Sequence, residues 1–351
     1  MITNLYADGF KSLKKFELRL QKGLNVLIGP NGAGKSNICQ ALGMVASAAE
    51  GNLSDYILSL GGASSTFTIT SPSKNKSRNN IKNLNISCKG DTRFQHKKDN
   101  WISLRYQYEF KLVLDEVLRI SEETLIIDKL FSNGKWRRVL SASRKESKRI
   151  IIKIHEKLAG PMSVRLFGKK KKFEFPGNED RLDSFFSALS SLFYYCYMVQ
   201  QDMRFSKAWN IEPYLAKKSS DILEPLNMLQ DGRGLSNAIH SMLKTGGKKL
   251  EEINEFMSRV LPRFAKINPE ISEDTLTRTF SVTDIDGVKC PANSLSDGNV
   301  KLIALLVGVL SRKRSTSIIE EPENYLHPWA AQYLVEYFRE HFSNGVCVIT
   351  M

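Results

Sequence analysis

The stretch Gly29-Pro-Asn-Gly-Ala-Gly-Lys-Ser36 decides how the rest of the chain is interpreted. It follows an apolar run, Leu24 to Ile28, that is typical of a buried strand, and it precedes an alanine-rich segment, Asn37 to Ala49, that is typical of a helix. A glycine-rich loop in this place turns backbone N–H groups toward phosphate oxygens, and the helix N-terminus adds a positive dipole. The spacing G-x-x-x-x-G-K-[ST] between a strand and a helix predicts a phosphate-binding loop.

Residues inside this loop have specific expected roles. The ammonium group of Lys35 should reach the β- and γ-phosphates of a bound nucleotide, and the hydroxyl of Ser36 should hold Mg²⁺. The residues predicted to bind the nucleotide are Asn31, Gly32, Gly34, Lys35, Ser36 and Asn37. A chance match in an ordinary turn is the alternative, and the flanking strand and helix make it the weaker one.

A second motif lies near the other end of the chain, in Ser317-Ile-Ile-Glu-Glu-Pro-Glu-Asn324. A short apolar strand ends there in two adjacent carboxylates, Glu320 and Glu321. Such a pair can divide the work, since one carboxylate binds Mg²⁺, usually through water, and the next polarises the attacking water. Alone, the motif is more often an acidic boundary between a strand and a loop. The phosphate-binding loop upstream makes the catalytic interpretation the better one.

A third motif, Ser294-Leu-Ser-Asp-Gly-Asn299, precedes an apolar segment, Val300 to Leu310, that is predicted to be a helix. A turn of serine and glycine at a helix N-terminus is a second place where an anion can bind. The simpler alternative is a helix cap made by Ser296 or Asp297. The position of Gly298, 22 residues before Glu320, favours a functional role.

The three motifs, in this order, resemble the ABC-type ATPase heads of the RecF, SMC and OLD (overcoming lysogenization defect) group, and especially the compact OLD-like and antiphage-defence AAA-type ATPases. Leu-Ser-Asp-Gly is the signature motif of that group. Leu5 to Leu13 also resembles its first strand and turn, and Leu229 to Ser236 resembles a helix start in its shorter bacterial members. The resemblance implies an α/β fold, a two-lobed head with a P-loop sheet and helices, an antiparallel β insert and a helical subdomain.

The resemblance also implies how the chain is divided. An ATPase lobe with the phosphate-binding loop is expected at 1–62, an antiparallel β and basic insert of the same domain at 63–200, a helical subdomain at 201–293, and the rest of the ATPase lobe at 294–351. The group has a switch histidine after the strand that corresponds to Val346–Thr350, whereas His341 precedes this strand and Met351 follows it. We therefore expect the protein to continue beyond residue 351.

Roles for single residues follow from the same resemblance. Gly29, Gly34, Lys35 and Ser36 match the Walker A motif. Glu320 stands where the group usually has an Mg²⁺-binding aspartate, and Glu321 would be the catalytic base. Ser296 and Gly298 would contact the γ-phosphate of ATP held by the other subunit of a homodimer, and Asn324 to His327 occupies the place of the D-loop.

The Q-loop glutamine of the group has two candidates here. Gln200 and Gln201 both follow Phe193 to Val199, a segment whose aromatic and β-branched residues predict a strand. Gln200 is the preferred candidate and is counted among the residues expected to bind the nucleotide, and a polar residue at the edge of the core is the alternative.

Positive charge is concentrated in the middle of the chain. Two segments, Ser73 to Lys98 and Lys135 to Lys172, together hold 22 Lys and Arg residues but only three Asp and Glu residues. Their combined positive charge is larger than the net charge of +14 of the whole chain. A concentrated basic region fits a polyanion, so nucleic acid, with double-stranded DNA favoured, is the expected partner. A solvated loop surface or a lysine-rich host composition is the alternative.

Composition excludes several classes of protein. The chain is 42% hydrophobic and 25% charged, as in globular proteins. Its five cysteines are scattered, without a C-x-x-C pair, so neither a disulfide scaffold nor structural zinc is supported. The longest apolar run is far shorter than the roughly 20 residues of a membrane span. A cytoplasmic protein without a membrane partner is expected.

The resemblance leaves three functions open. In the first, ATP closes a homodimer whose ATPase controls a nuclease in antiphage defence, with the nuclease in a C-terminal domain or in a separate subunit, since no nuclease motif lies within these residues. In the second, the protein is a RecF-like DNA-repair clamp without a nuclease. In the third, ATP binding only stabilises a scaffold.

Overall fold

The computed structural model describes residues 1–68, 82–97, 100–145, 149–155, 172–176, 182–204, 208–311, 316–343 and 345–351. The chain divides into two compact units. Unit 1 comprises Met1–Gln21 and Pro30–Lys207, and unit 2 comprises Lys22–Gly29 and Ala208–Met351. Much of the expected basic insert, including 73–81 and 156–171, lies outside the described residues.

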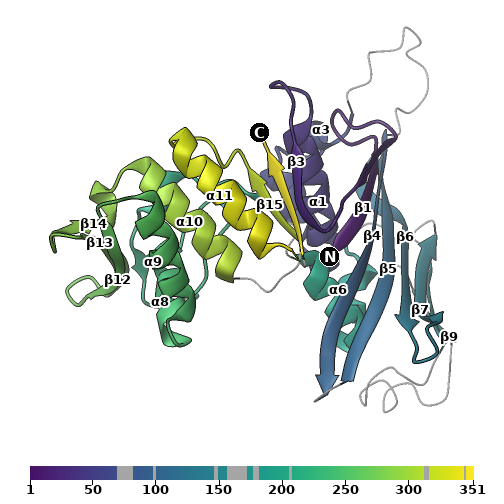
Figure 1. Ribbon diagram of the computed structural model, residues 1–351. Helices are drawn as coiled ribbons and strands as arrows, with labels where there is room; N and C mark the ends of the chain where they lie inside the picture. The colour runs from purple at the N-terminus through teal and green to yellow at the C-terminus, as the bar shows by residue number, and fades with distance from the viewer. Residues whose placement is uncertain are drawn as a thin grey trace, which may run out of the picture. The chain divides into compact units, whose positions relative to one another are not determined.

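Unit 1 is built on an eight-stranded sheet in which neighbouring strands run antiparallel, in the order β2-β1-β4-β5-β6-β7-β8-β9. The strands are β1 (Ile2–Asp8), β2 (Phe16–Arg19), β4 (Lys82–Lys97), β5 (Asn100–Leu114), β6 (Leu118–Leu130), β7 (Trp136–Lys145), β8 (Arg149–Ile154) and β9 (Lys172–Pro176). The helices are α1 (Lys35–Glu50), α2 (Leu53–Ser59), α3 (Ala63–Thr66), α5 (Phe185–Leu192) and α6 (Tyr194–Arg204). Figure 1 shows the long strands β4 and β5 side by side, with α6 next to them.

Alternation of side chains along the strands explains why one face of this sheet is covered. In β5 the side chains of Leu104, Tyr106, Tyr108 and Phe110 are buried, and the residues between them point to the opposite face. Helices pack on the buried face, where the ring of Phe186 in α5 lies 5.0 Å from that of Tyr108. An antiparallel sheet commonly has one packed and one solvated face, and the period-two alternation from Trp101 to Phe110 is typical of such a strand.

The abundance of Ser, Asn, Gly and Lys between Gly51 and Asn100 is typical of loops and short edge strands, but the structure corrects that interpretation for residues 82–97. Strand β4 has 16 residues and lies between β1 and β5, inside the sheet. Its buried residues Leu84, Ile86 and Cys88 alternate with polar ones. The abundance of Asn, Ser and Lys therefore reflects a solvated sheet face rather than a loop.

The predicted strand from Phe193 to Val199 is also wrong, because this segment belongs to helix α6. Tyr195, Cys196, Val199 and Met203 are its buried apolar residues, and their spacing is that of one helix face. Aromatic and β-branched residues favour strands only weakly, and packing on the helix side overrides that preference here.

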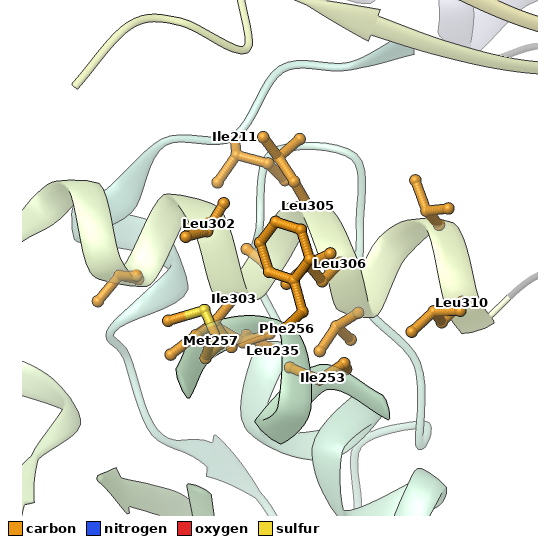
Figure 2. Packing of buried hydrophobic residues seen from close by; sticks show 14 of the residues in the cluster. Ile211, Leu235, Ile253, Phe256, Met257, Leu302, Ile303, Leu305, Leu306 and Leu310 are labelled. Atoms are coloured by element: carbon orange, nitrogen blue, oxygen red, sulfur yellow. The ribbon is translucent and has the colours of Figure 1, made fainter. Parts of the chain in front are cut away.

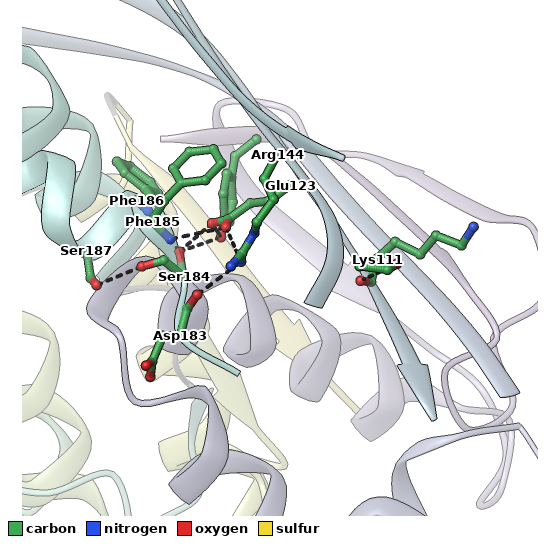
Figure 3. Close-up of polar contacts among 10 residues, drawn as sticks. Lys111, Glu123, Arg144, Asp183, Ser184, Phe185, Phe186 and Ser187 are labelled. Atoms are coloured by element: carbon green, nitrogen blue, oxygen red, sulfur yellow. Dashed lines mark hydrogen bonds and ion pairs between the residues drawn. The ribbon is translucent and has the colours of Figure 1, made fainter. Parts of the chain in front are cut away.

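A buried ion pair connects the sheet of unit 1 to the start of α5 (Figure 3). Glu123 in β6 and Arg144 in β7 are 1% and 2% exposed, and Oε2 of the glutamate lies 2.7 Å from Nη2 of the arginine. The hydroxyl of Tyr108 donates to Glu123 (2.8 Å), and the backbone N–H of Phe185 donates to it as well (3.1 Å). Ser184, whose hydroxyl also donates to Glu123, caps α5 by accepting from a backbone N–H. The pKa of Tyr108 is raised, mainly because the side chain is buried and secondly because the negative charge of Glu123 lies beside it.

Unit 2 contains a parallel sheet with the strand order β10-β15-β16-β3 and a smaller antiparallel sheet. The parallel strands are β3 (Gly23–Leu27), β10 (Ala208–Trp209), β15 (Thr316–Glu320) and β16 (Val346–Thr350), and the antiparallel ones are β11 (Ser220–Asp221), β12 (Phe264–Ser272), β13 (Thr277–Asp284) and β14 (Lys289–Pro291). The helices are α7 (Pro213–Ala216), α8 (Leu235–Lys244), α9 (Lys248–Val260), the 3₁₀ helix η1 (Ala292–Ser294), α10 (Asp297–Ser311) and α11 (Pro328–His341). Strand β3 is an edge strand with Val26 exposed, so the full burial expected for it was wrong.

Helix α10 forms the centre of the core of unit 2. Every residue from Val300 to Leu310 is buried, which explains why all of them except Lys301 are apolar. Figure 2 shows its side chains packed against those of α8 and α9. The labelled residues are Ile211, Leu235, Ile253, Phe256, Met257, Leu302, Ile303, Leu305, Leu306 and Leu310. Across the described residues, no helix has both the length and the apolar character that a membrane crossing requires.

Candidate nucleotide-binding site

The predicted phosphate-binding loop leads from β3 into α1, as its sequence context requires. Gly32 and Gly34 have φ angles of 83° and 96°, a left-handed conformation that glycine adopts most readily. Gly34 is the N-cap of α1, and a Cβ at this position would lie 2.9 Å from Oγ of Ser12. The glycines therefore shape a loop that ends at a helix N-terminus, where backbone N–H groups favour an anion.

The side chains of the loop are held by neighbours within unit 1. Nζ of Lys35 donates to the backbone carbonyl of Pro30 (3.2 Å). Nδ2 of Asn37 donates to Oγ of Ser12 (2.8 Å), so the amide of this predicted nucleotide-binding residue contacts the turn after β1. Asn31, Gly32 and Ser36 are exposed. Ser12 lies in the turn that resembles the ABC-type heads, but the motif alone did not predict its contact with Asn37.

The paired glutamates lie at the carboxyl edge of the parallel sheet in unit 2. Strands β3, β16 and β15 run in the same direction with a continuous register, from Val346 opposite Gly23 to Glu320 opposite Thr350. Parallel strands end at one edge of a sheet, which is where α/β proteins bind ligands. Gly29, which follows β3, and Glu320 therefore belong to the same edge.

Glu321 is the most constrained residue of this edge. Its φ angle is 45°, which costs a non-glycine residue roughly 1–2 kcal/mol and requires support from its surroundings. Its backbone N–H donates to the carbonyl (3.1 Å) and hydroxyl (3.2 Å) oxygens of Thr350. Its backbone carbonyl accepts from Nζ of Lys301 (2.7 Å), and its carboxylate accepts from Nδ2 of Asn324 (2.7 Å). The side chain predicted to polarise water is thus held in one orientation.

Lys301 is a residue of this site that the sequence analysis missed. It lies in α10 with 1% of its surface exposed, and its Nζ is 5.4 Å from the centre of the Tyr325 ring. Burial lowers the pKa of its ammonium group. Nearby carboxylates oppose this shift, and they belong to Glu323, Glu321 and Glu212. A single lysine between the apolar residues Val300 and Leu302 to Leu310 was the available signal, because a buried charge needs partners.

The signature turn starts α10. The hydroxyl of Ser296 accepts from the backbone N–H of Asn299 (3.3 Å), so the capping interpretation describes this serine in the structure. Asp297 pairs with Lys217, whose Nζ is 2.6 Å away. A Cβ on Gly298 would lie 2.5 Å from the backbone oxygen of Tyr325, so only glycine allows the turn to pack against the loop that follows β15.

Gln200 does not occupy a loop after a strand, as the sequence had indicated. It lies in α6, and its Nε2 donates to the backbone carbonyl of Ala49 (2.7 Å), near the end of α1. The interaction stabilises helix packing in unit 1. The strand that supported its assignment as the Q-loop glutamine is absent from this described segment, so Gln200 is left out of the proposed site.

The residues expected to bind Mg²⁺ have suitable donor atoms. The hydroxyl of Ser36 and the carboxylate of Glu320 are oxygen ligands, which Mg²⁺ prefers, and Mg²⁺ on a nucleotide usually takes only one or two ligands from the protein. Among the described residues no cluster of three or more His, Cys, Asp or Glu side chains is arranged to hold a metal ion. Ser36 in unit 1 and Glu320 in unit 2 are each suited to supply one oxygen ligand to Mg²⁺.

A sequence-family comparison identifies the chain. The family model described as AAA ATPase domain matches residues 1–350. The chain belongs to the AAA ATPase domain family. A comparison with curated proteins found no match.

Solved structures show the fold of this AAA ATPase domain. A crystal structure of an SMC head bound to the C-winged helix domain of ScpA is similar with a TM-score of 0.52 and 15% identity, covering 100% of this chain and 89% of that one. Two other SMC heads are less similar. The TM-score is 0.38 for the SMC head domain from Thermotoga maritima, with 15% identity and with 99% of this chain and 88% of that one covered. It is 0.45 for an SMC head domain with an extended coiled coil, bound to the C-terminal domain of ScpA derived from Pyrococcus furiosus, with 12% identity and with 100% of this chain and 89% of that one covered. The similarity to the first of these structures shows the fold, and the predicted α/β fold of an ATPase head is confirmed.

Proposed function

We propose that this AAA ATPase domain binds ATP at the loop from Gly29 to Ser36 and hydrolyses it with Glu321 as the base. The observation that carries the proposal is the left-handed N-cap of α1, Gly34. It places Lys35 and Ser36 in the first turn of the helix, where backbone N–H groups are free to bind an anion. Family membership supports ATP as the nucleotide. The proposed nucleotide-binding residues are Asn31, Gly32, Gly34, Lys35, Ser36 and Asn37.

The residues divide the chemistry as follows. Lys35 provides positive charge for the β- and γ-phosphates, while Ser36 and Glu320 hold Mg²⁺. When bound, Mg²⁺ neutralises charge that develops on the phosphate oxygens. Glu321 orients and deprotonates the attacking water, and the hydrogen bond from Asn324 keeps its carboxylate in place. Because the base is already oriented, little rearrangement is needed when the reaction begins.

Replacing Lys35 by Ala should remove ATP binding and lower kcat/KM more than about 100-fold, because the phosphates lose their main cation. Titration with a fluorescent ATP analogue and phosphate release from ATP measure the two effects. Lys14→Ala removes an exposed lysine from the same unit and should change neither. Hydrolysis by Lys35→Ala at the wild-type rate would contradict the proposed site.

The proposal includes a homodimer closed by ATP. Ser296 and Gly298 would contact the γ-phosphate bound to the partner, and the loop from Asn324 to His327 would line the same interface as a D-loop. The placement of Ser296 at the N-terminus of α10 supports this role, since the helix dipole there favours an anion. The γ-phosphate then gives the contact that distinguishes the closed from the open state.

We also propose that the basic insert binds double-stranded DNA. In the described part of the insert, Lys135 and Arg137 are exposed beside the turn between β6 and β7, and the guanidinium group of Arg137 lies 5.3 Å from the ring of Phe131. Arg138, by contrast, pairs with Asp128 at 3.1 Å. Exposed cations on one strand and its turn suit contacts with phosphates, which carry no sequence information.

Reversing both charges, with Lys135→Glu and Arg137→Glu, should weaken duplex DNA binding about tenfold or more at low salt and reduce the salt slope by about two. Fluorescence anisotropy at several salt concentrations measures both quantities. The matched control, Lys248→Glu with Lys249→Glu, reverses two exposed lysines of unit 2 and should have little effect. Equal losses in the two double variants would contradict a DNA site on the insert.

The wider role we propose is control of a nuclease in bacterial antiphage defence, with the nuclease in a further domain or a separate subunit. The Glu-Glu-Pro-Glu-Asn motif and the compact head support it, because both resemble OLD-like ATPases. Co-purification of nuclease activity that depends on ATP tests this role, and an ATPase that acts on DNA with no associated nuclease would instead favour the RecF-like clamp.

A further inference from the structure

We propose that Lys301 is a positioning residue that links the signature turn to Glu321 and thereby couples the two ATP sites of the dimer. The inference rests on the proposed function, because the base and the dimer are parts of it. It adds a residue outside the three motifs and a reason for it to be buried.

The buried location of Lys301 is unfavourable for a charged group unless that group has hydrogen-bond partners and opposite charges nearby. Its neighbours in α10, Val300 and Leu302 to Leu310, are apolar and buried in the core of unit 2. An ammonium group loses its hydration in such a place and needs hydrogen bonds and opposite charges in return. The contacts of Nζ with Glu321 and Tyr325 provide these partners and explain why a lysine occurs at this place in α10.

The contacts of Nζ all belong to the loop that follows β15 or to its surroundings. Nζ donates to the backbone carbonyl of Glu321 (2.7 Å) and lies above the ring of Tyr325. The carboxylates of Glu323 and Glu212 add opposite charge nearby. One end of the lysine is therefore fixed in the signature helix, and the other end is fixed to the backbone of the proposed base.

A second contact joins the same two elements. Gly298, in the first turn of α10, approaches the backbone oxygen of Tyr325 so closely that no Cβ fits. Glu321 and Tyr325 have φ angles of 45° and 69°, which non-glycine residues keep only where neighbouring contacts enforce them. A shift of the signature turn would therefore change the backbone of the loop, and with it the carboxylate that Asn324 holds.

This linkage has a consequence for a dimer in which each signature turn contacts the nucleotide of the partner. Binding of that nucleotide would move or order α10, and Lys301 would transmit the change to Glu321 of its own subunit. Glu321 acts on the nucleotide of its own phosphate-binding loop. Each ATP site would then report its occupancy to the other, which is the condition for coupled sites.

The test is the dependence of hydrolysis on ATP concentration in the full chain. The wild type should be cooperative, with a Hill coefficient between about 1.5 and 2, since two sites set the upper limit. Lys301→Met keeps the length of the side chain but removes its charge and hydrogen bond. It should lower kcat about tenfold and bring the Hill coefficient to about 1, while affinity for a fluorescent ATP analogue stays within about twofold.

Two further variants separate positioning from stability. Adding Glu323→Gln to Lys301→Met removes a carboxylate that the first change leaves uncompensated, so the melting temperature should recover while cooperativity does not. Tyr337→Phe removes the hydrogen bond from the Tyr337 hydroxyl to Oε1 of Glu252 (2.6 Å). This bond joins α11 to α9 and involves neither Lys301 nor Glu321. It should lower stability slightly and leave cooperativity unchanged.

The outcomes distinguish the inference from the function on which it rests. A wild type without hydrolysis, or one whose hydrolysis survives Lys35→Ala, would overturn the proposed function and the coupling together. Cooperative hydrolysis that is unchanged in Lys301→Met would overturn the coupling alone. So would a non-cooperative wild type, or a double variant in which turnover and cooperativity recover together with the melting temperature.

Discussion

Glu321→Gln should stop ATP turnover while ATP binding persists. The amide has the shape of the carboxylate. The backbone carbonyl of residue 321 should still accept from Lys301, and its backbone N–H should still donate to Thr350, but the amide cannot accept a proton from the attacking water. Loss of a general base commonly costs 10²–10⁴ in rate, and we expect kcat to fall at least about 100-fold. Phosphate release under saturating ATP measures the change.

The same variant should accumulate as an ATP-bound dimer, because in the proposed cycle hydrolysis is the step that reopens the interface. Size-exclusion chromatography with light scattering, with and without ATP, detects the dimer. Glu340→Gln alters an exposed glutamate at the end of α11 and is the matched control, with wild-type turnover expected. A Glu321→Gln protein that remains monomeric with ATP would contradict the dimer, and one that retains full biological activity would favour the scaffold.

Glu123→Leu should destabilise unit 1 by about 3–5 kcal/mol, which is the usual effect of leaving a buried charge without its partner. The guanidinium group of Arg144 would remain buried, and the hydrogen bonds from Tyr108 and Phe185 would lose their acceptor. Urea denaturation measures the free energy of unfolding. With Trp209 and Trp329 of unit 2 replaced by Phe in every protein compared, the fluorescence of Trp101 and Trp136 reports on unit 1.

The neighbouring residue provides the control for this prediction. Glu122 is half exposed and lies 3.4 Å from Lys111, whose position away from the buried network is visible in Figure 3. Glu122→Gln should change the free energy of unfolding by less than about 0.5 kcal/mol. Combining Glu123→Leu with Arg144→Met removes both charges and should recover part of the loss. Equal effects of Glu122→Gln and Glu123→Leu would show that the buried pair has no special weight.

Local sequence patterns predicted the elements around the motifs well. Pro328 to His341 has the amphipathic period of a helix, and Val346 to Thr350 is a short apolar run rich in β-branched residues. These residues form α11 and β16 in the structure. The phosphate-binding loop was likewise predictable, since its glycines and its flanking elements are consecutive in the chain.

Features that depend on distant residues were not predictable in the same way. The contact of Lys301 with Glu321 joins positions 20 residues apart, and the contact of Asn37 with Ser12 depends on where the turn after β1 lies. Strand β4 was missed because its exposed face is as polar as a loop, and α6 because local β-preference is weaker than packing. Composition shows which residues are present, but three-dimensional contacts decide what each one does.

The pairing of β3 with β16 has a consequence for how the protein is made. The phosphate-binding loop follows β3, but this strand pairs with β16, which is synthesised more than 300 residues later. At roughly 5–20 residues per second, β3 waits on the order of tens of seconds for its partner strand. The nascent chain therefore cannot complete the carboxyl edge of this sheet, and hydrolysis begins only after synthesis has passed β16.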